Sequence, residues 1–130
     1  MEQIKWNEQG KIRVRESTEA QAKHLIVKSL VMFYIKIKHK DRSNIVKMYT
    51  EWPINSGKIC DVYYENAWSK EAIAYEIQDK ITTKWSEETQ KAYDGWEVHG
   101  IKNADYVVID LNKISDDINK MKKQIKELVI

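Results

Sequence analysis

Apolar positions near the start of the chain recur at helical spacing. Thr18 and Gln21 form a capping-box pattern, in which each side chain can satisfy a free backbone amide at the start of a helix. Apolar and small residues then recur every three or four positions, namely Ala22, Leu25, Ile26, Ser29, Leu30, Phe33 and Ile37. This spacing predicts a helix from Thr18 that buries this face against a sheet.

The segments that follow have the shorter period of strands. Residues 45–52 are rich in β-branched and aromatic side chains, which predicts a strand that ends at Pro53. Residues 57–64 and 72–80 alternate polar and apolar positions on either side of a polar loop, which predicts a hairpin. The apolar face is continuous when Cys60 faces Ile77, Val62 faces Tyr75 and Tyr64 faces Ile73.

The last third of the chain predicts a helix, a strand and a second helix. Residues 83–93 read as a helix that stops near Gly95, and residues 105–111 form a nearly uniform apolar strand that we expect to be buried on both faces. In the final helix, about 115–129, apolar residues alternate by four and three: Ile114, Ile118, Met121, Ile125 and Leu128. This seam suits either a helix pair in a homodimer or a helix that covers the sheet of its own domain.

The length of the chain predicts one domain over residues 1–130. From the order of its helices and strands we expect an α/β fold. Basic and acidic residues nearly cancel, 22 against 20, so nucleic-acid binding would need a local patch. The one cysteine, Cys60, lies on the apolar face of its strand, which predicts a buried, inert thiol and excludes an intrachain disulfide. Neither a signal peptide nor a membrane span is recognisable, so we expect an intracellular protein in the cytoplasm, or in the host cytoplasm if it is viral.

The polar face of the hairpin carries the candidate chemistry. The same register places Asp61 opposite Glu76, with Gln78 and Lys80 on that face. Directly opposed side chains lie about 4.5–5.5 Å apart at Cβ, where like charges destabilise a sheet unless a cation lies between them. The pair therefore predicts a divalent metal site. The alternative is two unrelated acids on a solvated strand face.

The order helix, three strands, helix, strand, together with Asp61 and Glu76, resembles the PD-(D/E)xK nuclease superfamily. This resemblance implies the restriction-endonuclease-like fold of that family, a mixed β-sheet flanked by helices. In that family the first strand of the hairpin carries an Asp and the second carries Glu-x-Lys. Asp61 and Glu76 match these positions, while Gln78 stands in place of the lysine. The resemblance covers roughly residues 17 to 111. Lys80, on the same face as Gln78, could supply the missing charge.

The resemblance implies a nuclease that hydrolyses phosphodiester bonds, most simply a DNA endonuclease dependent on Mg²⁺ or Mn²⁺. It implies that Asp61, Glu76 and the main-chain carbonyl of Ile77 hold the metal ion, with Glu19 as a further carboxylate from the first helix. Glu19 is equally explained as an acid favoured in the first helical turn. Gln78 can orient a water molecule but cannot take its proton. The alternative function is a catalytically inactive nuclease-fold protein that binds nucleic acid or a protein partner.

Contacts with DNA would come from lysines beside this face, which can neutralise phosphates. The candidates are Lys70, Lys80, Lys84 and Lys91. Each of them is also explained as part of a solvated surface. Trp68 lies at the hairpin tip among polar residues, where an exposed indole could stack on a base or wedge against DNA. Packing under the loop is the alternative for this side chain.

Overall fold

The computed structural model describes residues 18–42, 45–54, 57–102 and 104–129 of the chain. Within these residues, α-helices and strands follow one another in the predicted order. They are α1 (Glu19–Lys38), β1 (Val46–Pro53), β2 (Ile59–Asn66), β3 (Glu71–Gln78), α2 (Thr83–Tyr93), β4 (Asp105–Asp110) and α3 (Ile118–Val129). The predicted capping box is confirmed, because the amide of Gln21 donates to Oγ1 of Thr18 and the amide of Thr18 donates to Oε1 of Gln21.

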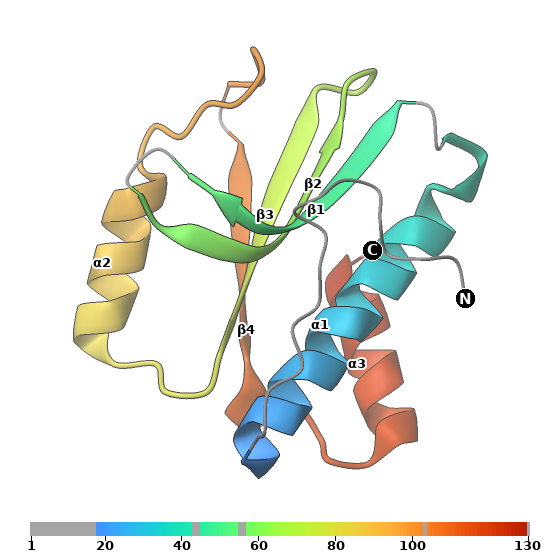
Figure 1. Ribbon diagram of the computed structural model, residues 1–130, viewed down its shortest axis with the longest axis vertical. Coiled ribbons are helices and arrows are strands. Elements are labelled where there is room, and N and C mark those ends of the chain that lie inside the picture. The colour runs from blue at the N-terminus through green and yellow to red at the C-terminus, as the bar shows by residue number, and fades with distance from the viewer. Residues whose placement is uncertain (1–17, 43–44, 55–56, 103, 130) are drawn as a thin grey trace.

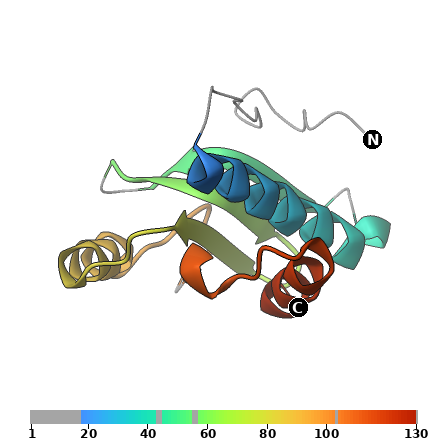
Figure 2. The same cartoon turned by 90° about the horizontal axis from the view of Figure 1, so that it is seen from below.

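The strands form one mixed sheet, in which they lie in chain order. β1, β2 and β3 are antiparallel neighbours, whereas β4 runs parallel to β3 because α2 crosses over between them. Figure 1 shows α2 on one side of the sheet and α1 with α3 on the other. Seen from below, α2 again lies well apart from α1 and α3 (Figure 2). The chain is therefore an α/β fold with a four-stranded mixed sheet flanked by helices.

The hairpin of β2 and β3 has the predicted register over part of its length, while the predicted pairs Cys60–Ile77 and Asp61–Glu76 lie beyond the observed ladder. Val62 faces Tyr75 and Tyr64 faces Ile73. The pairing runs from the hairpin tip as far as Val62 and Tyr75, and Asp61 is the next residue of β2 beyond this last pair.

The alternation of side chains breaks at one point shared by β1 and β2. Glu51 has a positive φ of 50°, which is uncommon for a residue with a side chain, and the regular β1–β2 pairing skips Glu51 and Asp61. On one side of this break, Val62 packs towards α1 and α3, while on the other side Trp52 and Cys60 pack towards the opposite core. The prediction that Cys60 shares a face with Val62 is therefore wrong, because strict alternation holds only along a regular strand.

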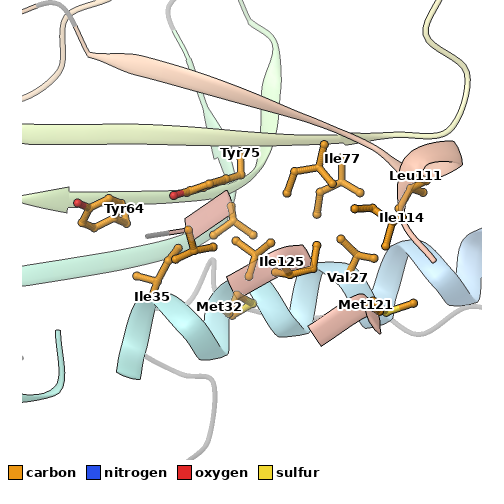
Figure 3. Packing of buried hydrophobic residues seen from close by; sticks show 14 of the residues in the cluster. Val27, Met32, Ile35, Tyr64, Tyr75, Ile77, Leu111, Ile114, Met121 and Ile125 are labelled. Atoms are coloured by element: carbon orange, nitrogen blue, oxygen red, sulfur yellow. The ribbon is translucent and has the colours of Figure 1, made fainter. Parts of the chain in front are cut away.

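The larger core lies between the sheet and the helices α1 and α3, and we call it the helix-pair core (Figure 3). Its buried members are Val27, Val31, Met32 and Ile35 of α1, Met48, Val62, Tyr64, Tyr75, Ile77 and Ile109 of the sheet, and Leu111, Ile114, Met121, Ile125 and Val129. Burial raises the pKa of Tyr75 to about 12, so its phenol stays uncharged within this core.

α1 buries a different face from the one that the sequence pattern predicts. Ile26, Phe33 and Ile37 are 43%, 50% and 50% exposed, whereas Val27 and Val31 are fully buried. The helix is apolar on most of its sides, so two stripes satisfy the same helical spacing. Periodicity alone could not decide which stripe faces the sheet.

The smaller core lies on the α2 side of the sheet, and we call it the α2-side core. Its buried members are Ile54, Cys60, Tyr63, Ala72, Ala74, Tyr93, Trp96 and Ile101. Trp52 covers it by stacking on Tyr63, with ring centroids 5.1 Å apart and planes inclined by 11°. Cys60 is fully buried, and this burial raises its pKa, so the thiol stays protonated. The predicted burial of this cysteine is confirmed.

A tight turn in the connection between α2 and β4 is tied to β2. Val98 and Ile101 exchange backbone hydrogen bonds of 3.1 and 2.8 Å, and His99 and Gly100 between them both have positive φ, as a type I′ turn requires. Such a φ costs His99 about 1–2 kcal/mol. Its Nδ1 lies 2.7 Å from Oε1 of the buried Glu65, and this contact offsets the strain.

β4 and α3 complete the helix-pair core. Ile109 of β4 is buried but its neighbour Val108 is only partly so, and burial of this strand is therefore less complete than predicted. In α3, Ile125 is fully buried while Ile118 and Leu128 are 47% and 41% exposed, so the predicted seam is interrupted at these two positions. α3 covers the sheet of its own domain, and the homodimer stays a prediction. None of the described helices is long and apolar enough to cross a membrane.

Replacement of Ile125 by alanine should lower the free energy of unfolding by about 2–5 kcal/mol, because it opens a cavity in the helix-pair core. The matched variant Ile118→Ala, on the exposed side of the same helix, should change it by about 0.5 kcal/mol or less. Urea unfolding of both variants measures the two values. Equal losses would contradict the burial of α3 described above.

Candidate functional site

The candidate carboxylates lie where the pairing of β2 and β3 ends. The main-chain pairing of β2 with β3 ends at Val62 and Tyr75. Beyond this pair, Oδ2 of Asp61 accepts a 2.7 Å hydrogen bond from the amide of Ile77. The amide therefore finds a partner although the regular ladder has stopped. Asp61 thus links the two strands through its side chain.

The other oxygen of Asp61 contacts α1. Its Oδ1 lies 3.2 Å from Nε2 of His24, and the two side chains are 23% and 33% exposed. Solvent therefore reaches this pair. The sequence singled out Glu19 from the same helix, and Glu19 lies exposed at the first position of α1. His24 was not among the predicted site residues, although it precedes the buried Val27 and Lys28 by one helical turn.

Glu76 points towards the α2 side, where it is buried. Its Oε2 accepts a 2.5 Å hydrogen bond from the hydroxyl of Tyr93, whose ring stacks on Tyr106 at 4.4 Å. Burial raises the pKa of Glu76 above its usual range, the Tyr93 hydrogen bond and the charge of Lys58 lower it, and the charge of Asp61 raises it. The alternative of a solvated strand face is therefore wrong for Glu76, which is 5% exposed.

Asp61 and Glu76 engage helices on opposite sides of the sheet, yet they remain electrostatically coupled. Asp61 contacts His24 of α1, and Glu76 contacts Tyr93 of α2. The charge of Asp61 nevertheless raises the pKa of Glu76, and both carboxylates raise the pKa of the Cys60 thiol. The structure thus brings the two predicted carboxylates to one end of the hairpin. Their sharing of one metal ion stays a prediction.

Lys58 is a cation of this site that the sequence analysis missed. It comes directly before β2, and its charge lowers the pKa of Glu76. Its Nζ also lies 5.1 Å from the ring centroid of Trp85 on α2, within the range of a cation–π contact. Its position three residues before Asp61 was the only signal in the sequence.

Gln78 and Lys80 lie at the end of β3 and in the loop that follows it. Nε2 of Gln78 donates a 3.2 Å hydrogen bond to the main-chain carbonyl of Lys80, so this amide is engaged by the loop. The side chain of Lys80 is exposed.

The predicted nucleic-acid contacts are divided between two ends of the molecule. Trp68 and Lys70 lie at the hairpin tip, beyond Asn66, the last residue of β2, which is five residues from Asp61, or about 17 Å at the usual strand rise. Trp68 is 73% exposed, so packing under the loop is wrong. The turn is fixed from within, because Oδ1 of the buried Asn66 accepts hydrogen bonds from the amides of Trp68 and Ser69.

The lysines of α2 lie beyond the other end of the hairpin. Lys84, in the first turn of α2, is exposed and lies 4.0 Å from Glu88 of the same helix. Lys91 is exposed in the last turn. The structure thus separates Lys80, Lys84 and Lys91 from the hairpin tip.

The donor set at this site suits an open cation site rather than a closed one. In the described part of the chain, no group of three or more His, Cys, Asp or Glu side chains is arranged to hold a metal ion. Asp61 and Glu76 would supply two carboxylates. Mg²⁺ is usually bound through one or two carboxylates together with water and substrate phosphates. The residues fit that mode of binding.

Glu76→Gln should make the protein more stable than the wild type at pH 8 and similarly stable at pH 4. The raised pKa means that the native state holds a proton that the unfolded chain releases, so wild-type stability falls as the pH rises from about 4.5 through the raised pKa. Glutamine can still accept the Tyr93 hydrogen bond and does not ionise. Urea unfolding at both pH values tests this, and an equal pH dependence in the two proteins would contradict it.

Comparison with known proteins adds no relative: no family model, no curated protein and no solved structure matches the chain. What this site does must therefore be inferred from its own residues.

Proposed function

We propose that the chain is a metal-dependent nuclease that hydrolyses phosphodiester bonds, with DNA as its substrate. The observation that carries this proposal is the convergence of Asp61 and Glu76 at one end of the hairpin, where the charge of Lys58 lowers the pKa of Glu76. Two carboxylates and one ammonium group supply both the ligands for a divalent ion and a positive charge for a phosphate. Carboxylates with a perturbed pKa cluster at functional sites, and burial raises the pKa of Glu76.

In this proposal Asp61 and Glu76 hold Mg²⁺ or Mn²⁺, and the main-chain carbonyl of Ile77 is a further candidate ligand. When bound, such an ion would polarise the phosphate and lower the pKa of its bound water. Substrate phosphate and water complete the coordination, as hard cations require.

The neighbouring side chains position the two carboxylates. Tyr93, held by its stack on Tyr106, fixes one oxygen of Glu76, and His24 fixes one oxygen of Asp61. Burial raises the pKa of Tyr93, which keeps its hydroxyl protonated as a donor. The imidazole of His24 is also a group that can accept a proton. Gln78 cannot do so.

We further propose that the fold is restriction-endonuclease-like. The order of helices and strands and the mixed sheet flanked by helices are what that resemblance implies, and they support this proposal. The acidic residues on β2 and β3 occupy the corresponding strands. Glu19 remains a candidate for a further carboxylate from α1.

A second candidate function is a nuclease-fold protein that binds nucleic acid or a protein partner without cleaving. Gln78 is the observation that favours it, because an amide replaces the lysine of the motif and its nitrogen is engaged by the carbonyl of Lys80. The site would then lack a cation at that position. A nuclease assay separates the two functions.

Asp61→Asn should abolish cleavage, or slow it by about 10²-fold or more, because a metal ion contributes several kcal/mol to transition-state stabilisation. The change is isosteric, and asparagine can still accept the hydrogen bond from Ile77. The full chain should be assayed on linear, nicked, flapped and four-way DNA with Mg²⁺ or Mn²⁺, with urea unfolding as the control for folding. Equal rates in the wild type and the variant would refute the enzyme assignment.

A comparison of Lys58→Ala with Lys80→Ala tests which lysine supplies the charge that Gln78 lacks. The charge of Lys58 lowers the pKa of Glu76, so its removal should slow single-turnover cleavage by about 10²–10⁴-fold, the usual range for loss of an acid–base or charge-stabilising group. Lys80 is exposed, and its removal should leave the rate within a few-fold. The reverse result would transfer the role to Lys80.

A further inference from the structure

α3 carries a concentration of positive charge that its surroundings leave uncompensated. Its twelve residues include four lysines and one glutamate, a net charge of +3, whereas the whole chain has a net charge of +2. The lysines are Lys120, Lys122, Lys123 and Lys126, and all four are exposed. None of them forms an ion pair with another described residue.

The acids nearest to this helix already have structural partners. Asp116 lies 2.9 Å from Nζ of Lys23, and Oδ1 of Asp117 accepts hydrogen bonds from the first amides of α3, those of Asn119 and Lys120. Asp116 is therefore paired with a lysine of α1, and Asp117 is held at the first turn of α3, where it caps the helix.

α2 provides a contrast within the same protein. It has two lysines, Lys84 and Lys91, and two glutamates, Glu87 and Glu88, so its net charge is zero. Lys84 also lies beside Glu88. Lys84 and Lys91, two of the four lysines that the sequence analysis assigned to DNA contact, thus belong to a neutral helix, and the basic surface lies on α3.

The lysine face of α3, defined by those four lysines, belongs to a helix whose other side is packed in the core. Met121, Ile125 and Val129 on the opposite side of the helix are buried in the helix-pair core (Figure 3). Lysines three or four residues apart are displaced by about 4.5–6 Å along a helix axis. The face therefore presents a row of ammonium groups that can follow a chain of phosphates.

The start of α3 lies next to the helical turn that holds Asp61. Nζ of Lys23 donates a 2.5 Å hydrogen bond to the carbonyl of Ile114, just before α3, and His24 beside it contacts Asp61. α3 then runs alongside α1 on the side of the sheet opposite α2 (Figure 1). A polyanion at the candidate site can continue along this helix.

We propose that the lysine face of α3 binds the phosphate backbone of the nucleic acid on which the candidate site acts; the identity of this partner rests on the proposed function. An anionic membrane fits less well. The exposed apolar side chains of α3, Ile118 and Leu128, lie ten residues apart, about 15 Å along the axis, and form no continuous surface for insertion.

The test replaces Lys120, Lys122, Lys123 and Lys126 together by glutamine, in the Asp61→Asn background so that cleavage does not consume the DNA. The matched control is Lys84→Gln with Lys91→Gln in the same background. Binding of labelled single-stranded and double-stranded DNA is measured over a range of salt concentrations. The fourfold variant should bind at least tenfold more weakly near 0.1 M salt, with a salt slope smaller by about 3–4, roughly one per lysine lost, while the control should change little.

Unchanged affinity and slope in the fourfold variant would overturn the proposal, as would an equal loss in the α2 control. Binding of the wild type to phosphatidylserine vesicles without binding to DNA would overturn it in favour of a membrane. Urea unfolding of each variant shows whether a loss of binding is caused by a loss of folding. If the fourfold variant is unfolded, two double variants replace it: Lys120→Gln with Lys122→Gln, and Lys123→Gln with Lys126→Gln. Lysine-dependent binding without cleavage by the wild type would refute the nuclease and leave this inference intact.

Discussion

The hydrogen bond from the amide of Ile77 to Asp61 is the contact around which the candidate site is organised. The alternation of β1 and β2 fails at Glu51 and Asp61, so the ladder cannot serve this amide in the regular way. A carboxylate that replaces a main-chain acceptor keeps β2 and β3 together and is itself fixed in place. The neighbouring Glu76 is thereby fixed too, because it precedes the anchored residue of β3. The proposed metal site and the pairing of β2 with β3 thus depend on the same side chain.

The helices, the strands and part of the hairpin register could be predicted because they depend on residues that are close in the sequence. The capping box at Thr18 and the alternation that pairs Val62 with Tyr75 involve residues close in the sequence, and the structure contains both. The convergence of Asp61 and Glu76 at one end of the hairpin follows from that register. Residue spacing is enough to predict an element wherever the pattern fits the period of a helix or of a strand but not both.

The remaining features depend on contacts between distant segments. Which stripe of α1 is buried follows from the shape of the sheet beneath it, since both stripes are apolar. Glu76 is buried with a hydrogen bond from Tyr93, and its pKa is lowered by the charge of Lys58, which lies just before β2. Neither contact could be predicted from the residues that flank Glu76 in the sequence. The single residue Glu51, with its positive φ, shifts Cys60 to the other core, and no pattern of hydrophobicity encodes such a break.

The turn at His99 changes the entropy of the connection between α2 and β4. A parallel neighbour strand requires a crossover, and ordering its chain costs conformational entropy that grows with length. The hydrogen bonds between Val98 and Ile101, with the contact of His99 to Glu65, divide this connection into two shorter spans. Shorter spans leave less freedom for β4 to slip along β3, and a slip of one residue would exchange its two faces. One strained residue outside the candidate site therefore helps to keep the edge strand in register.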